Sequence, residues 1–186
     1  CKIISSGRKI NIDSKYYIDN VQLERVDFTS DLGVIFDSQL NFNNHINEKI
    51  KKANSMLGII RRNFGLVPQD VFLLLYCSLV RSHLEYANTV WNPHSKIAIE
   101  RLEKVQIRAT KLVYSIKHLE YGERLKALRL PTLKYRRLRG DLIEVYKIVT
   151  HYNEDVNCMF NFNCDSITRG NIFKLLQDRF RYDLRK

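Results

Sequence analysis

The strongest constraint on the fold is an apolar stretch in the middle of the chain, residues 69–91. Within it, residues 71–80 are almost entirely apolar, so that at helical spacing the apolar side chains cover most of the circumference. A helix that is apolar on all sides is buried on several faces. Residues 71–80 are far fewer than the roughly 20 that span a bilayer, and Arg81, His83 and Glu85 follow at once. The stretch therefore predicts the central helix of a helical bundle, with no membrane partner.

The ends of this predicted helix are set by prolines. Pro68 suits a first helical turn, where a missing N–H costs nothing. Pro93 ends the helix because the residue before a proline avoids helical angles. One face is expected to form the main buried stripe, with Leu73, Leu74, Tyr76 and Val80 filling much of the rest. The residues of this stripe are Val71, Phe72, Leu75, Leu79 and Leu84.

An amphipathic helix is predicted before the central one. It begins near Asn41 or Asn43, either of which suits a cap, and Gly65 ends it. Its apolar seam repeats every three or four residues and consists of Ile46, Ile50, Ala53, Leu57, Ile60 and Phe64. Five cations are expected away from this seam: Lys49, Lys51, Lys52, Arg61 and Arg62.

A third helix is predicted after Ser95, and it carries the most informative charge pattern. Its apolar seam contains Leu102, Val105, Ala109, Leu112 and Ile116. One residue ahead of that seam runs a basic stripe, which consists of Arg101, Lys104, Arg108 and Lys111. This offset places the cations about 100° round the helix from the seam. The stripe is either a solvated face whose stems pack along the core edge, or a set of phosphate contacts. Glu100 and Glu103 stand at helical spacing to weaken it.

Two more helices complete the bundle. A short one covers residues 121–128 with Leu125 and Leu128 inward, and a long one begins at Pro131 or Thr132. The seam of the long helix contains Leu138, Leu142, Val145 and Val149. A second basic cluster in its first two turns consists of Lys134, Arg136, Arg137 and Arg139. Positive charge near a helix N-terminus opposes the helix dipole, which favours an electrostatic use for these side chains.

The first residues differ from the rest. Short β-prone runs at residues 1–5, 15–18 and 32–36 lie between turn residues, and they predict strands of a small antiparallel segment. The predicted class is therefore mainly α, a helical bundle preceded by a small antiparallel β segment. We expect three parts: a β segment at residues 1–38, a helical region at 39–152, and a loop with a basic tail at 153–186. Both chain ends look cut, so a fragment of a longer protein is expected.

Charge and motifs limit the function classes. Lys and Arg outnumber Asp and Glu by 31 to 20, a net charge of +11, which makes a polyanion a reasonable partner. No glycine-rich phosphate loop, adjacent aspartate pair or zinc-ligand spacing is present. The four cysteines are scattered, and without a signal peptide a reducing, intracellular compartment is expected, either nucleus or cytoplasm. We predict no catalytic residue, no metal ligand and no cofactor in this chain. The five histidines are expected at the surface or the core edge, with His83 the best candidate to reach a groove edge, and Trp91 is expected to be a core residue.

Several segments in order resemble the region after the catalytic palm in reverse transcriptases of LINE-type (jockey-like) non-LTR retrotransposons. The matching segments are Asp31-Leu32-Gly33-Val34, Leu40-Asn41-Phe42, His45-Ile46, Leu79-Val80-Arg81, His83-Leu84-Glu85-Tyr86, Trp91-Asn92-Pro93, Leu102-Glu103-Lys104-Val105-Gln106, Arg108-Ala109-Thr110, Glu123-Arg124-Leu125 and residues 130–142. Ser82 departs from the pattern where a proline is common, and Ile107 where a basic residue is common.

The resemblance implies that the first residues are the last palm strands and a primer-grip-like turn at Leu32-Gly33-Val34. The helices then correspond to the thumb and the connection after it. The metal-binding aspartates of that family lie in an upstream motif that this sequence lacks, so the chain alone is expected to be inactive. Magnesium is implied only for the full-length polymerase. The implied partners are an RNA/DNA template–primer and the upstream fingers and palm of the same polypeptide.

Joined with the charge pattern, the resemblance predicts a thumb-like region that holds template–primer duplex through its phosphates. The first-rank contacts are the basic stripe on the third helix and the basic cluster on the last one. Arg61, Arg62 and Arg81 are second-rank contacts. The sequence leaves two alternatives open: a helical protein-interaction module, and a non-functional remnant of a degenerate element.

Overall fold

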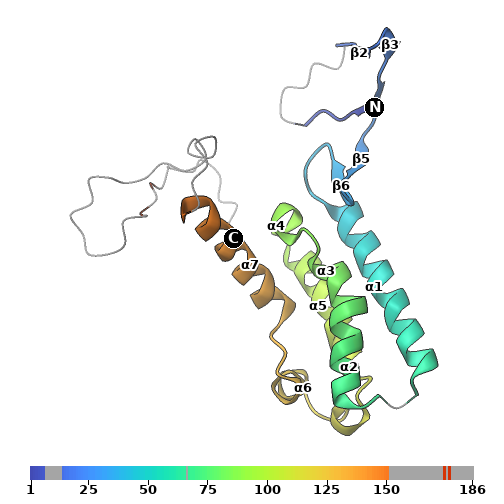
Figure 1. Ribbon diagram of the computed structural model, residues 1–186, viewed down its shortest axis with the longest axis vertical. Helices are drawn as coiled ribbons and strands as arrows, with labels where there is room; N and C mark the ends of the chain where they lie inside the picture. Colours follow the sequence, from blue (N-terminus) through green and yellow to red (C-terminus); the bar gives the residue numbers. More distant parts are fainter. Residues whose placement is uncertain (7–13, 66, 151–173, 175, 177–186) are drawn as a thin grey trace. The chain divides into compact units, whose positions relative to one another are not determined.

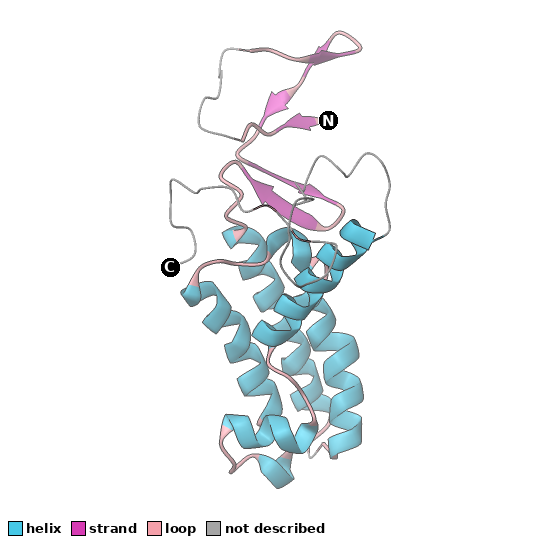
Figure 2. Ribbon diagram, turned by 90° about the vertical axis from the view of Figure 1, so that its left-hand side faces the viewer, coloured by secondary structure: helices cyan, strands magenta, loops and turns pink. Residues whose placement is uncertain are grey.

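The computed structural model describes residues 1–6, 14–65, 67–150, 174 and 176 (Figure 1). The helical elements are α1 (Asn43–Asn63), α2 (Gln69–Leu75), the π-helix η1 (Tyr76–Arg81), α3 (Ser82–Glu85), α4 (Asn88–Trp91), α5 (Lys96–Thr110), the 3-10 helix η2 (Tyr114–Ile116), α6 (Tyr121–Leu128) and α7 (Leu133–Thr150). The strands are β1 (Lys2–Ile3), β2 (Tyr17–Ile18), β3 (Val21–Gln22), β4 (Glu24–Arg25), β5 (Phe28–Asp31) and β6 (Val34–Asp37). Figure 2 shows that helices dominate, which confirms the predicted fold class.

The chain divides into two compact units, Cys1–Arg137 and Leu138–Lys186. In the first unit, α1 packs against η1, α3 and α5, and α6 packs against α5. The predicted loop and basic tail at residues 153–186 lie outside the described residues, apart from two isolated positions. No helix in the described part of the chain has the length and apolar character needed to cross a bilayer.

The strands of the described residues form three two-stranded pairs. β2–β3 and β5–β6 are antiparallel, as predicted, whereas β1 pairs with β4 in parallel. Both antiparallel pairs are hairpins with two-residue turns whose φ angles are positive, at Asp19-Asn20 and at Leu32-Gly33. Such turns match the twist of the flanking strands. The predicted strand at residues 32–36 is therefore wrong at its first two positions, because Leu32 and Gly33 form the turn.

The hairpin β5–β6 is pinned to α1 by side chains of that helix. Lys49 Nζ donates to the Gly33 carbonyl oxygen at 3.1 Å and lies 5.8 Å from the centre of the Tyr86 ring. Lys49 is only 8% exposed, so the expectation that it lies away from the seam is wrong. An interior lysine needs an acceptor for its ammonium group, and the hairpin turn supplies one.

The start of α1 is held by an acid rather than by the predicted asparagine caps. The N-cap residue is Phe42, which has a left-handed conformation and makes no side-chain cap bond. Asp37 at the end of β6 instead accepts hydrogen bonds from the backbone N–H groups of Gln39, Asn41 and Phe42, at 3.0, 3.0 and 2.7 Å. The strand therefore sets where the helix begins, and a helix-capping pattern read locally misses it.

The central helix differs from its prediction in two ways. It ends at Glu85 instead of reaching Trp91, because Ala87 takes a left-handed φ of 51° before α4. It is also buried on one face only, since Val71, Leu74 and Leu79 are 39%, 71% and 41% exposed. The fully buried residues lie four apart, as Phe72, Tyr76, Val80 and Leu84.

The π-helix explains this spacing. A step of four residues overshoots an α-helical turn by about 40°, so four residues spaced in this way drift round the helix. The wider turn of a π-helix in η1 takes up part of this drift. The face with Phe72 and Leu84 consequently stays turned toward the core.

Trp91 and His45 join α4 to α1 and the hairpin. Trp91 is 1% exposed, and its Nε1 donates to the Tyr86 carbonyl oxygen at 2.7 Å, which confirms a core role. Its ring lies 5.2 Å from the fully buried His45 imidazole. His45 Nδ1 accepts a hydrogen bond from the backbone N–H of Ile35 at 3.1 Å. Its Nε2 has no hydrogen-bond partner among the described residues. Burial lowers the pKa of His45 from its ordinary 6.5 to about 4, assisted by nearby Lys49.

This histidine predicts a pH-dependent stability. Between pH 6.5 and about 4, the unfolded chain binds a proton at His45 that the folded chain does not. Acidification through this window therefore lowers the free energy of unfolding, by up to about 1.4 kcal/mol per pH unit. In His45→Asn the amide oxygen can replace Nδ1 as the acceptor without titrating. Denaturant titrations at a series of pH values should show a shallower slope in the variant. Parallel curves for the two proteins would assign the pH dependence to other groups.

Candidate nucleic-acid interface

The basic stripe of α5 lies on the surface, as its spacing predicts. Arg101, Lys104, Arg108 and Lys111 are all exposed, while Leu102, Val105 and Ala109 beside them are fully buried. The core contact of α5 with α1 therefore orients the stripe outward. Helix α5 ends at Thr110, one residue before Lys111 and earlier than the predicted seam, which continues to Ile116.

Two asparagines of α1 orient the arginines of the stripe. Arg101 Nη2 donates to Asn47 Oδ1 at 2.5 Å, and Arg108 Nη1 donates to Asn54 Oδ1 at 3.3 Å. Both pairs advance by seven residues in the same direction, so α1 and α5 run parallel here. These amide acceptors carry no charge, so they direct the guanidinium groups across the helix boundary without neutralising them.

A basic groove results between the two helices, which we call the α1/α5 groove. Near the C-terminal ends of both helices it contains a hollow of about 520 Å³. The residues that line this hollow are Asn54, Leu57, Gly58, Arg61, Arg108, Lys111 and Leu112. Arg61, a second-rank prediction, thus joins two first-rank predictions in one place. None of the described residues that line the hollow is acidic.

On the α1 side of this groove, sequence reasoning identified Arg61 as a candidate contact but not the row to which it belongs. Its row is Asn47, Lys51, Asn54, Gly58 and Arg61, at alternating steps of four and three residues. Such steps place all five on one face of the helix, and Asn47 and Asn54 are fixed there by their arginine partners. The spacing of these five residues can be read from the sequence. Only the contact with α5 shows that this polar face of α1 lies beside the basic stripe.

The acids that were expected to weaken the stripe do not pair with it. Glu103 faces the other way, where it accepts a hydrogen bond from Tyr121 Oη and from the backbone N–H groups of Leu133 and Lys134, the last two at 3.4 and 3.3 Å. Burial and this carboxylate together raise the pKa of Tyr121. Within the described part of the chain, the ion pairs do not involve Arg101, Lys104, Arg108 or Lys111. Glu103 also compensates the positive charge at the start of α7.

The second basic cluster does not form one surface. Arg136 pairs with Glu85 through two nitrogens, with Nη2 at 2.9 Å from Oε2, and the carboxylate raises the pKa of Arg136. Arg81 contacts the same carboxylate at 3.5 Å. Arg137 is 2% exposed. These three arginines are therefore not open phosphate contacts, because ion pairing or burial occupies them. Only Lys134 and Arg139 of the cluster are exposed.

Arg62 is exposed but directed along its own helix, with Nε at 3.3 Å from the Gly58 carbonyl oxygen. It serves the end of α1, where basic side chains also suit the helix dipole. Among the sequence-predicted residues, the structure consequently brings together Arg61 and the four stripe residues. Arg62, Arg81, Arg136 and Arg137 are engaged with other partners or buried, so they do not join this group.

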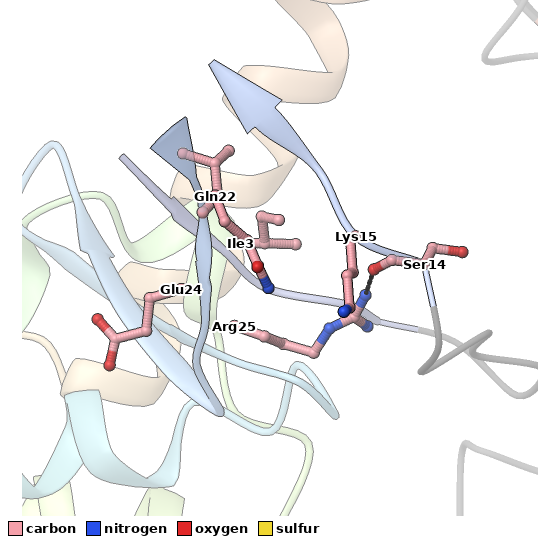
Figure 3. Close-up of a pocket in the computed structure, with 7 residues that line it drawn as sticks. Ile3, Ser14, Lys15, Gln22, Glu24 and Arg25 are labelled. Atoms are coloured by element: carbon pink, nitrogen blue, oxygen red, sulfur yellow. Dashed lines mark hydrogen bonds between the residues drawn. The ribbon is translucent and has the colours of Figure 1, made fainter. Parts of the chain in front are cut away.

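A second polar hollow, of about 490 Å³, lies among the strands (Figure 3). Of the two cations that line it, Lys15 and Arg25, Arg25 is already engaged: it donates to Ser5 Oγ at 2.6 Å and to the Ser14 carbonyl oxygen at 3.0 Å. Glu24, which also lines it, lies 3.8 Å from Lys2. An acid and an arginine already bound to protein oxygens make this hollow a poorer anion site than the α1/α5 groove.

Chemically, the α1/α5 groove can hold an extended anion without reacting with it. Its side chains are cations and amides, which bind phosphate oxygens by charge and by hydrogen bonds. Long Lys and Arg side chains read no base sequence when they contact a backbone. Among the described residues, no cluster of three His, Cys, Asp or Glu side chains is placed to hold a metal.

Comparisons with known proteins leave the family open. An uncharacterized protein of Caenorhabditis elegans, B0403.1, is 26% identical over 137 residues, which is 71% of this chain and 69% of the other. No family model matches the chain, and no solved structure matches it.

Proposed function

We propose that this chain is the thumb-like part of a reverse transcriptase of a non-LTR retrotransposon and holds RNA/DNA template–primer by its phosphates. The observation that carries the proposal is the α1/α5 groove, with Arg61, Arg101, Lys104, Arg108 and Lys111 and no acid among the described residues that line its hollow. A polymerase must hold its duplex at every sequence and let it move. Flexible cationic side chains on backbone phosphates meet both needs.

The same proposal places the polymerase chemistry outside this sequence. The chain contains no adjacent aspartate pair, so we assign it neither the catalytic magnesium ions nor any step of nucleotide addition. The upstream fingers and palm of the polypeptide are the proposed protein partners. The described chain then contributes affinity and orientation.

The proposal is tested by competition. A labelled RNA/DNA hybrid bound to the chain is challenged with unlabelled hybrid, double-stranded DNA, single strands and heparin at matched charge concentration. We expect the unlabelled hybrid to displace the label at a lower concentration than heparin, because the spacing of its backbone phosphates as well as its charge fits the groove. If all four competitors, including heparin, displace the label equally, the chain binds any polyanion and the proposal of a specific template–primer contact is contradicted.

One observation favours a second function, a protein-interaction module. Val71, Leu74 and Leu79 form an exposed apolar row on the central helix, and Leu74 is 71% exposed. Such rows are used to dock other proteins. Substitution of Leu74 by a polar residue distinguishes the two functions. Hybrid binding should stay unchanged if the α1/α5 groove is the contact surface, whereas binding of a protein partner to the apolar row should be lost.

A further inference from the structure

The width of the α1/α5 groove limits what it can hold. Arg101–Asn47 and Arg108–Asn54 hydrogen bonds cross from one helix to the other, so the two rows lie within reach of one side chain. Axes of packed helices are about 8–10 Å apart. A depression between such helices accommodates one sugar-phosphate chain but not the two backbones of a duplex.

The length of the groove gives the number of nucleotides. From Arg101 to Lys111 the helix rises about 15 Å. A strand within a duplex advances about 3.4 Å per nucleotide along the axis. The four cations of the stripe therefore face about four to five consecutive phosphates of one strand.

Gly58 gives the groove an open floor. A glycine inside a helix destabilises it relative to alanine, yet a Cβ added at Gly58 would meet nothing within 4 Å. Packing within the chain therefore does not require glycine at this position. A glycine at this position leaves room for a ligand backbone to come close to the helix, and Gly58 lines the hollow together with Arg61, Arg108 and Lys111.

We infer that the α1/α5 groove binds a single phosphodiester strand that lies along both helices and passes over Gly58. This inference rests on the proposed function and deepens it. Lys51 and Arg61 contact the strand from α1, opposite the basic stripe of α5. Asn47 and Asn54 are positioning residues, since they hold Arg101 and Arg108 toward the strand.

The Gly58→Ala variant tests the floor of the groove. Its helix should be more stable, so Tm should rise, while affinity for an oligonucleotide of about ten nucleotides should fall at least about threefold. Gly58→Gln should bind more weakly still. A higher Tm shows that the variant is folded, so unfolding cannot explain its loss of affinity. Unchanged affinity in both variants would overturn the close approach at Gly58.

The variants Lys51→Ala and Arg61→Ala test the α1 row, with Lys126→Ala on α6 as a charge-matched control. Each of the two should lower the salt slope of binding by one contact's worth for both ligands, about 0.9 for a hybrid and about 0.7 for a single strand. A loss seen for the hybrid alone would show that the groove spans a duplex, which overturns the inference. If stripe variants lose binding and these variants do not, the groove assignment fails while the proposed function stands. If neither set loses binding, the proposed function fails as well.

Discussion

Replacement of all four stripe residues, Arg101, Lys104, Arg108 and Lys111, by alanine is expected to remove most of the affinity for an RNA/DNA hybrid. Each lost phosphate contact reduces the slope of log K against log salt by about 0.9, so the slope should become shallower by three to four units. At low salt the affinity should fall more than about a hundredfold. Because the four side chains are exposed, stability should change by only about 1 kcal/mol.

The control for this variant removes the same charge elsewhere. The four exposed lysines Lys52, Lys96, Lys117 and Lys126 lie outside the α1/α5 groove, and their combined replacement by alanine lowers the net charge equally. If net charge alone governs binding, the two quadruple variants will lose affinity to the same extent. A selective loss in the stripe variant assigns the contacts to α5.

The second large effect is expected on stability, from Gln106→Leu. Gln106 is 1% exposed and links two elements: Tyr76 Oη donates to its Oε1 at 2.7 Å, and its Nε2 donates to the Pro131 carbonyl oxygen at 2.9 Å. Leucine leaves both partners buried without a hydrogen bond. The free energy of unfolding should fall by about 2–4 kcal/mol, measured by denaturant titration.

A double variant provides the control for Gln106. Tyr76→Phe combined with Gln106→Leu removes both ends of one bond, so that the phenol no longer lacks an acceptor. Loss of stability in the double variant should be clearly smaller than the sum of the two single losses. Strictly additive losses would show that the bond between Tyr76 and Gln106 contributes nothing.

The parts of the fold that depend on local pattern were predictable. The stripe of α5, the bounds of α6 and the start of α7 after Thr132 all follow from spacing and caps, and Thr132 Oγ1 accepts from the Tyr135 N–H at 3.1 Å. Such features require only neighbours along the chain. The predicted seam of α7 fared worse, since Leu138 and Leu142 are 56% and 63% exposed.

The features that depend on distant partners were not predictable. An all-apolar helix has no periodicity that tells its buried face from its exposed one, so the exposure of Leu74 was missed. Lys49 resembles its exposed neighbour Lys51 until the hairpin supplies a carbonyl oxygen. Arg136 belongs to a basic run in the sequence, but it forms an ion pair with Glu85, which is distant in the chain. The α5 side of the candidate site could thus be predicted from the sequence, whereas on α1 only Arg61 was predicted as a contact.

The most direct measurement is an NMR titration of isotopically labelled chain with an RNA/DNA hybrid, at a salt concentration that keeps binding specific. We predict that the largest shift changes map to two rows. They are Asn47, Lys51, Asn54, Gly58 and Arg61 on α1, and Arg101, Lys104, Arg108 and Lys111 on α5. Changes centred instead on Leu74 and Leu79 of the central helix, or spread evenly over all surface lysines, would contradict a nucleic-acid contact in the α1/α5 groove.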